Sequence, residues 1–111
     1  MTKTEKLPVF GYKGNSYFFT VYPLQEHYPS EAGVYIFAKR IAAPNPVFTI
    51  VFIGEMVSLA NIAAKQRAAW LENAGVNTVC LLPVEKQENR LNIVEELVDR
   101  YKPEYNVAAN G

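Results

Sequence analysis

The side chains most often used in catalysis are few in this chain and lie far apart. His27 is the only histidine and Cys80 the only cysteine. His27 lies in the polar segment before Pro29, which predicts a solvated loop side chain. Cys80 lies within the apolar run NTVCLLPV, which predicts a buried thiol whose thiolate is disfavoured. The residues therefore give little support to nucleophilic catalysis by a serine or cysteine with a histidine.

Other patterns of catalytic or binding residues are equally sparse. The carboxylates gather late in the chain, where a solvated helix face is the simplest reading; they are Glu85, Glu88, Glu95, Glu96, Asp99 and Glu104. No glycine-rich loop for phosphates can be matched. One cysteine and one histidine exclude both a disulfide framework within the chain and a zinc finger.

Composition narrows the class of protein further. The 111 residues predict one domain, 1–111, and half of them are hydrophobic, which is an ordinary globular composition. Eleven basic residues balance eleven acidic ones, which excludes a strongly cationic nucleic-acid binder. No apolar run reaches the roughly 18 residues of a membrane span. We expect no membrane partner, and without a signal-peptide pattern we expect a cytoplasmic location.

The first half of the chain predicts two hairpins. Residues 8–12 and 16–24 are predicted to form two strands. They are joined by Lys13-Gly14-Asn15, a sequence suited to a tight turn. Residues 1–7 are polar and are expected to be loose. Residues 33–40 and 47–53 form the second pair, joined by the proline-containing loop 42–46. Because 47–53 is almost entirely apolar and Gly54 follows, we expect a central strand, covered on both faces, that ends at Gly54.

The second half predicts helix, strand and helix. Residues 57–73 are rich in alanine with apolar residues at helical spacing, Gly75 marks an end, and 77–84 is a buried strand. Residues 87–101 form a second helix that ends before Pro103, with Glu96 and Arg100 placed to pair on its outer face. Its apolar stripe is Leu91, Val94, Leu97, Val98 and Tyr101. The fold class is therefore α+β, with helices packed on a small, mostly antiparallel sheet.

Three segments in this order resemble the GIY-YIG nuclease superfamily. They are Gly33-Val34-Tyr35 on one strand, Phe52-Ile53-Gly54 at the end of the next, and residues 97–106, LVDRYKPEYN. The resemblance covers residues 31–107 and leaves the hairpin 8–24 outside it. It implies a small antiparallel sheet flanked by helices, with the active face beside the two motif strands.

The resemblance also implies a site for phosphodiester hydrolysis. Family members use one divalent metal held by a glutamate, tyrosines in both motifs, a helix arginine and a terminal asparagine. Such groups suit the reaction, because an anionic centre needs a cation and the attacking water needs positioning. Tyr35 matches the first tyrosine and Asn106 the asparagine.

The sequence departs from the family pattern at three positions. Phe52 stands where the second tyrosine is usual, Ile62 where the arginine is expected, and Val94 where the metal-binding glutamate is expected. We therefore expect no metal or other cofactor, and Mg²⁺ or Mn²⁺ only if nuclease activity survives.

Substitutes for the missing groups lie nearby in the sequence. Glu95 is a weak candidate metal ligand, since one step along a helix turns a side chain by about 100°. Arg90 lies one turn before Val94 and could face the site. Lys65 and Arg67 lie one turn beyond Ile62 and could reach a phosphate only if the helix is shifted.

Three functional hypotheses follow. The one we favour is a GIY-YIG-like domain that has lost its chemistry and serves as a binding or interaction module. Its partner could be nucleic acid if the basic residues gather on one side; these are Lys65, Arg67, Arg90, Arg100 and Lys102. The first alternative is a divergent metal-dependent endonuclease that uses Tyr35, Arg90 and Asn106. The second is a homodimer formed through the aromatic first hairpin; its aromatics are Phe10, Tyr12, Tyr17, Phe18, Phe19 and Tyr22.

Overall fold

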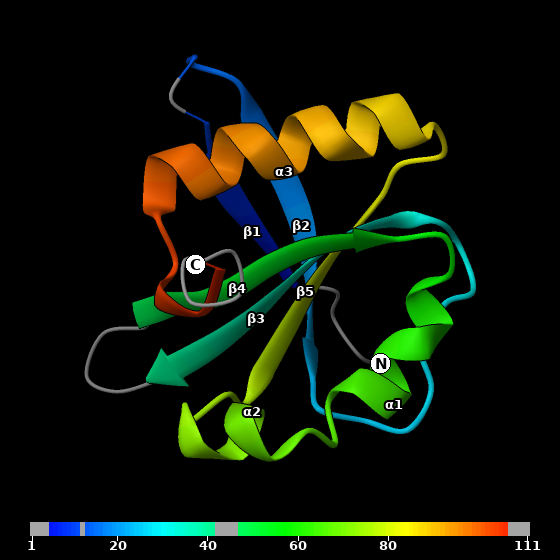
Figure 1. Ribbon diagram of the computed structural model, residues 1–111, viewed down its shortest axis with the longest axis vertical. Helices are drawn as coiled ribbons and strands as arrows, with labels where there is room; N and C mark the ends of the chain where they lie inside the picture. Colours follow the sequence, from blue (N-terminus) through cyan, green and yellow to red (C-terminus); the bar gives the residue numbers. More distant parts are fainter. Residues whose placement is uncertain (1–4, 12, 42–46, 107–111) are drawn as a thin grey trace.

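A computed structural model describes residues 5–11, 13–41 and 47–106 of the chain, and it confirms the α+β class. Five strands form one antiparallel sheet in the order β1-β2-β5-β3-β4 (Figure 1). Their bounds are β1 Glu5–Phe10, β2 Ser16–Pro23, β3 Gly33–Ile41, β4 Val47–Met56 and β5 Thr78–Pro83. The predicted loop 42–46 and Tyr12 lie outside the described residues.

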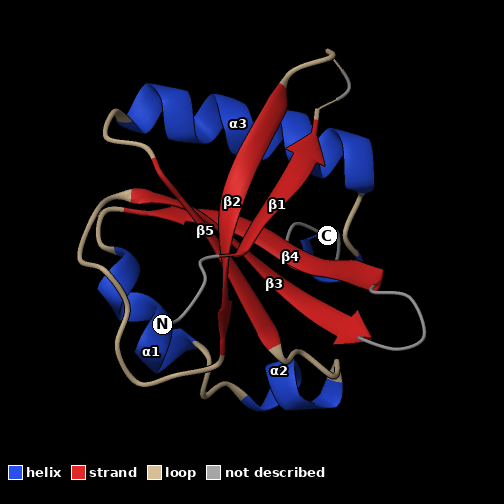
Figure 2. Ribbon diagram, turned by 180° about the vertical axis from the view of Figure 1, so that it is seen from behind, coloured by secondary structure: helices blue, strands red, loops and turns tan. Residues whose placement is uncertain are grey.

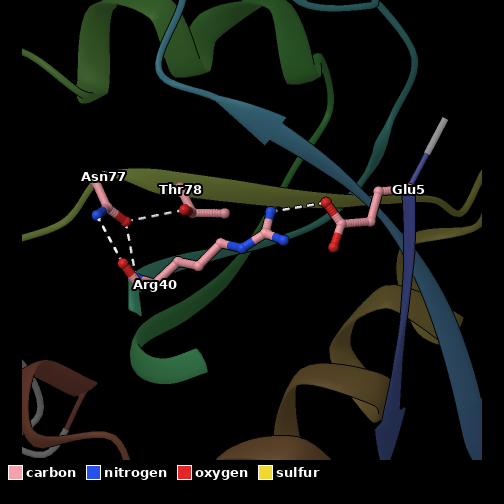
Figure 3. A network of polar contacts seen from close by, with 4 residues as sticks. All are labelled: Glu5, Arg40, Asn77 and Thr78. Carbon is pink, nitrogen blue, oxygen red and sulfur yellow. Dashed lines mark hydrogen bonds and ion pairs between the residues drawn. The ribbon is translucent and has the colours of Figure 1, made fainter. Parts of the chain in front are cut away.

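The first hairpin is an integral part of this sheet. β2 pairs with β5, with Thr20 opposite Leu81 and Tyr22 opposite Val79. The expectation that residues up to 7 are loose is wrong for 5–7, because β1 already begins at Glu5 and pairs with β2 from there. Arg40 of β3 donates a hydrogen bond to the Glu5 carboxylate at 2.7 Å (Figure 3). This ion pair joins β1 to β3 although two strands separate them in the sheet.

The helical elements in the described part of the chain include η1 (Leu59–Asn61), α1 (Ile62–Lys65), α2 (Ala69–Asn73) and α3 (Gln87–Tyr101), and residues 104–106 are helical as well. The bounds predicted for the last helix are confirmed. The single helix predicted over 57–73 is wrong, because Ala68 adopts an extended conformation with φ −64° and ψ 136°. Just before the break, the Gln66 side chain accepts a hydrogen bond from the Tyr28 hydroxyl at 2.6 Å and donates one to the Gln25 carbonyl. These contacts hold the chain at the corner between α1 and α2.

The two faces of the sheet carry separate hydrophobic cores. Along β3, Val34 and Ile36 point toward α3, whereas Tyr35 and Phe37 point toward α1 and α2. α3 crosses the sheet in front in Figure 1 and behind it in Figure 2. Side chains on opposite faces of this sheet therefore belong to different sites.

The buried face of α3 agrees with part of the predicted stripe, since Val94, Leu97 and Val98 pack on the core. Leu97 is fully buried, but Leu91 is 50% exposed and Tyr101 38% exposed. Glu96, expected on the outer face with Arg100, is instead buried and accepts hydrogen bonds from Tyr17 and Asn15. The buried face of α3 therefore also includes the Glu96 carboxylate, which lies against the first hairpin, where two donors compensate its loss of water.

β4 is an edge strand and not the predicted central one. Its inner half is covered on both faces, since Val51 belongs to one core and Ile53 to the other, but Val47 is 51% exposed. The strand also continues past Gly54 to Met56. The apolar sequence of β4 thus reflects side chains that are covered on both faces along part of its length. Among the described residues, no strand pairs with the outer side of β4.

None of the described helices is long and apolar enough to cross a membrane.

Candidate ligand-binding site

A pocket of about 460 Å³ opens between the sheet and the corner that joins α1 to α2. Its lining is aromatic and cationic: Tyr35, Phe37, Phe52, Trp70, Lys65 and Arg67. The aromatic side chains come from β3, β4 and α2, and the two basic ones from the end of α1 and the residues after it. The volume lies within the usual range for small-molecule sites.

The aromatic wall is a connected cluster of rings. Tyr35 stacks on Phe52 with ring centroids 6.0 Å apart, and Phe52 meets Trp70 edge-on at 5.8 Å. Trp70 in turn stacks on Tyr105 at 4.8 Å. Such contacts fix the ring orientations, so the wall is held from β3 through to the C-terminal segment.

Tyr35 forms the floor of this pocket and is only 2% exposed. Burial raises the pKa of its hydroxyl, while the charge of Lys65 acts in the opposite direction and lowers it. The Lys65 Nζ lies 5.7 Å from the centre of the Tyr35 ring. The phenol is therefore a neutral group at neutral pH, able to donate a hydrogen bond beside a cation.

The described residues that line the pocket include two cations, Lys65 and Arg67. Lys65 and Arg67 are both exposed, and no acidic side chain is among the described residues that line the cavity. Within the described part of the chain, the Arg67 guanidinium has no hydrogen-bond or ion-pair partner. The pocket thus combines an apolar wall with two exposed basic side chains. The carboxylate whose charge acts on Tyr35 is that of Glu55, which lies outside the lining and is paired with Arg90.

The motif glycines serve the packing around Tyr35. Gly54 lies directly opposite Tyr35 in the β3–β4 ladder, and a Cβ atom there would lie 2.5 Å from the Tyr35 hydroxyl oxygen. A Cβ at Gly33 would lie 2.4 Å from the Leu82 carbonyl oxygen. Both positions therefore require glycine for close packing.

Arg90, the proposed substitute on the last helix, is engaged in structural contacts. Its Nε donates to Glu55 at 2.8 Å, and its Nη1 donates to the carbonyls of Val84 and Glu85. The side chain is 3% exposed. It joins the start of α3 to β4 and to the loop after β5, and it does not line the Tyr35 pocket.

Asn106 lies at the free side of β4. Its amide accepts a hydrogen bond from the Ile53 N–H and donates one to the Ile53 carbonyl, both at 2.8 Å. The side chain therefore imitates one residue of a neighbouring strand and satisfies two backbone groups at a sheet edge. It too is absent from the Tyr35 pocket.

The remaining positions of the expected site are dispersed. Ile62 is fully buried in the core beneath α1 and α2, whereas Val94 packs against the other core, on the α3 face. Glu95 is exposed and lines a polar depression with Asn15 and Tyr17, away from Tyr35. Among the described residues, no group of three or more His, Cys, Asp or Glu side chains could hold a metal ion.

Sequence reasoning missed Trp70 as a site residue and gave Lys65 and Arg67 only a conditional role. Trp70 falls within the single helix predicted over residues 57–73. The helix break at Ala68 is what brings these three side chains to one pocket. The signal available in the sequence was the single tryptophan, which lies three residues after an arginine.

Comparison of the chain with protein families, curated proteins and solved structures found no match.

Proposed function

We propose that this chain is a GIY-YIG-like domain that does not cleave phosphodiesters and acts as a binding module, with its ligand held in the Tyr35 pocket. The single observation that carries the proposal is the separation of Tyr35 and Val94 onto opposite faces of the sheet. A metal-dependent nuclease needs the metal ligand and the tyrosine at one centre. A cytoplasmic location belongs to the same proposal.

The fate of the other expected groups supports loss of the chemistry. Val94 carries no carboxylate, and Ile62 carries no charge and is fully buried. Arg90 is committed to Glu55 and two carbonyls. Asn106 is committed to the Ile53 backbone. Each side chain thus has a structural role that explains its presence without catalysis.

Cleavage assays test the proposal directly. Supercoiled plasmid and single-stranded DNA are incubated with Mg²⁺ or Mn²⁺ and either the original protein or Tyr35→Phe, with an active metal-dependent nuclease as a positive control. We expect no cleavage from either protein. Cleavage by the original protein that is lost in Tyr35→Phe would overturn the proposal and favour the endonuclease alternative.

A second candidate function, homodimer formation through the first hairpin, has one specific observation in its favour. Phe10 is 51% and Phe18 59% exposed, whereas Phe19 is fully buried and Tyr17 packs toward α3. Two exposed phenylalanines on one hairpin are an apolar surface of the kind found at interface cores.

Pairing of two β1 edges is the less favourable way to form such a dimer. The Gly11 N–H points toward β2 and donates to the Asn15 carbonyl. Because successive residues of a strand point their N–H groups to opposite sides, the Phe10 N–H points to the outer side of β1. There it donates to the Tyr101 hydroxyl at 3.1 Å. Pro8 occupies the next outward position and has no N–H to donate. We therefore expect any dimer to form through the hairpin face.

Sedimentation across a wide concentration range tests this candidate. A concentration-dependent dimer that Phe18→Ser abolishes would support it. Val57→Ser is the matched control, since Val57 is 74% exposed and lies outside the hairpin. A monomer at every concentration would contradict it.

A further inference from the structure

The Tyr35 pocket has two chemically distinct parts that indicate one kind of ligand. Its wall is aromatic, formed by Phe52 and Trp70 above the Tyr35 floor. Its rim is cationic, formed by Lys65 and Arg67. An aromatic ring is favoured by the first part through stacking and edge contacts, and an anion by the second.

The paired cations favour a phosphate as that anion. Arg67 offers a planar fork of donors that fits phosphate oxygens, and Lys65 offers a compact charge. Lys65 lies over the Tyr35 ring, with its Nζ 5.7 Å from the ring centre, so this cation lies directly above the floor of the pocket. No acidic side chain among the described lining residues competes for these groups.

The distribution of the other basic residues favours a compact ligand over a long duplex. Arg90 is buried in its ion pair with Glu55. Arg100 and Lys102 lie at the C-terminal end of α3, the helix that packs on the opposite face of the sheet. The five basic residues considered as a nucleic-acid surface therefore do not form one continuous basic patch; they are Lys65, Arg67, Arg90, Arg100 and Lys102. Only Lys65 and Arg67 are available to contact a phosphate at this pocket.

We propose that the Tyr35 pocket binds an aromatic ring that carries a phosphate, with the ring against Phe52 and Trp70 and the phosphate between Lys65 and Arg67. The inference rests on the proposed function, because it treats the pocket as a binding site and not a site of cleavage. A free mononucleotide and one nucleotide of a single strand share this chemistry.

Trp70 provides a direct readout, since it is the only tryptophan in the chain and lines the pocket. Its fluorescence is titrated with adenosine monophosphate, with adenosine, and with ribose 5-phosphate. We expect saturable quenching by the monophosphate and binding at least ten-fold weaker for the other two. Equal affinity for adenosine and its monophosphate would overturn the phosphate assignment.

Variants assign the binding to this pocket. Arg67→Ala and Lys65→Ala are each expected to raise the dissociation constant for the monophosphate about ten-fold, because each removes one charged hydrogen bond. Arg100→Ala and Lys86→Ala are the matched controls, because both positions are exposed and lie outside the pocket. Equal losses in variants and controls would overturn the inference.

A short oligothymidylate identifies the source of the ligand. Tighter binding by the strand, weakening as salt rises and lost in Arg67→Ala, supports the inference with a strand as the ligand. Binding confined to the mononucleotide supports it with a free nucleotide. Failure of both probes in a protein that also does not cleave DNA overturns the inference alone, whereas cleavage that depends on Tyr35 overturns the proposed function.

Discussion

Tyr35 and Gly54 face each other across the β3–β4 ladder so closely that the hydroxyl of one occupies the space of a Cβ on the other. The distance from an ideal Cβ at Gly54 to the Tyr35 hydroxyl oxygen is 2.5 Å, and to its Cζ 2.6 Å. Tyr35 is nearly fully buried and stacks on Phe52. The glycine therefore lets the ring lie flat along β4 and keep the floor of the pocket in place.

Gly54→Ala is expected to displace the Tyr35 ring and to lower the free energy of unfolding by about 1–3 kcal/mol, as in other overpacked cores. The Trp70 fluorescence spectrum should change as well, because Phe52 links Tyr35 to Trp70. Urea denaturation measures the loss of stability.

A double-mutant cycle shows whether the contact with Tyr35 is the cause. In a Tyr35→Leu background the clash is relieved, so Gly54→Ala should cost less there than in the original protein. Strictly additive losses would mean that the alanine is poorly tolerated for another reason.

Asn106 is expected to protect the backbone N–H of Ile53, at the outer edge of β4, from exchange with solvent. Asn106→Ala leaves the Ile53 N–H and C=O without their partner, which should cost about 1–3 kcal/mol and speed hydrogen exchange of the Ile53 amide. Asn106→Asp keeps an acceptor for the N–H and should retain slower exchange than Asn106→Ala. Asn89→Ala, at an exposed position of α3, is the control; an Ile53 amide that exchanges equally slowly in all three variants would contradict this role.

Arg90 is expected to be a stability residue. Arg90→Ala removes the partner of Glu55 and three hydrogen bonds from a 3% exposed side chain. Because the Glu55 side chain keeps 23% of its exposure, the expected loss of about 3 kcal/mol is at the lower end for a broken buried pair. Thermal or urea unfolding measures it. Arg100→Ala, on the exposed side of the same helix, should change stability by less than about 0.5 kcal/mol, and similar losses for both arginines would refute the assignment.

The elements that the sequence predicted well are those specified by local patterns. The bounds of α3 follow from its apolar spacing and from Pro103 after it, and the first part of β3 follows from the apolar run at residues 34–38. The helix break at Ala68 could not be predicted in this way. It accompanies a hydrogen bond that the Tyr28 hydroxyl donates to the Gln66 side chain and one that Gln66 donates to the Gln25 carbonyl. Both partners precede Gln66 by about forty positions, with β3 and β4 between them in the chain, so local propensity does not predict the break.

The candidate site shows the same division. Tyr35 was identified from its motif, but the pocket around it depends on the break that places Lys65, Arg67 and Trp70 together. The strand order, which makes β4 an edge, and the burial of Glu96 against Tyr17 are likewise decided by tertiary contacts. A helical stripe alone does not determine which way α3 rotates when a polar partner lies on the sheet beneath it.

The last prediction concerns alkaline pH and the thiol of Cys80. Burial raises the pKa of this thiol from 9.0 to about 12, with the nearby charge of Glu5 acting in the same direction and that of Arg40 against it. Between these two values the unfolded chain has lost the proton and the folded chain still holds it. The contribution of this thiol to the free energy of unfolding is therefore fully present below about pH 9, and it is lost as the pH rises above that value.

The free energy of unfolding should fall by about 1.4 kcal/mol per pH unit above pH 9 from this thiol alone. The raised pKa values of Tyr17, Tyr28 and Tyr35, all caused mainly by burial, add to the fall once the pH passes about 10. Cys80→Ala removes only the thiol contribution, so its curve between pH 9 and 10 should be the flatter one, whatever its stability at neutral pH. Urea denaturation at half-unit intervals measures both slopes. Parallel curves for the two proteins would show that the thiol is not held protonated in the folded chain, and rapid reaction of Cys80 with a thiol reagent under native conditions would lead to the same conclusion.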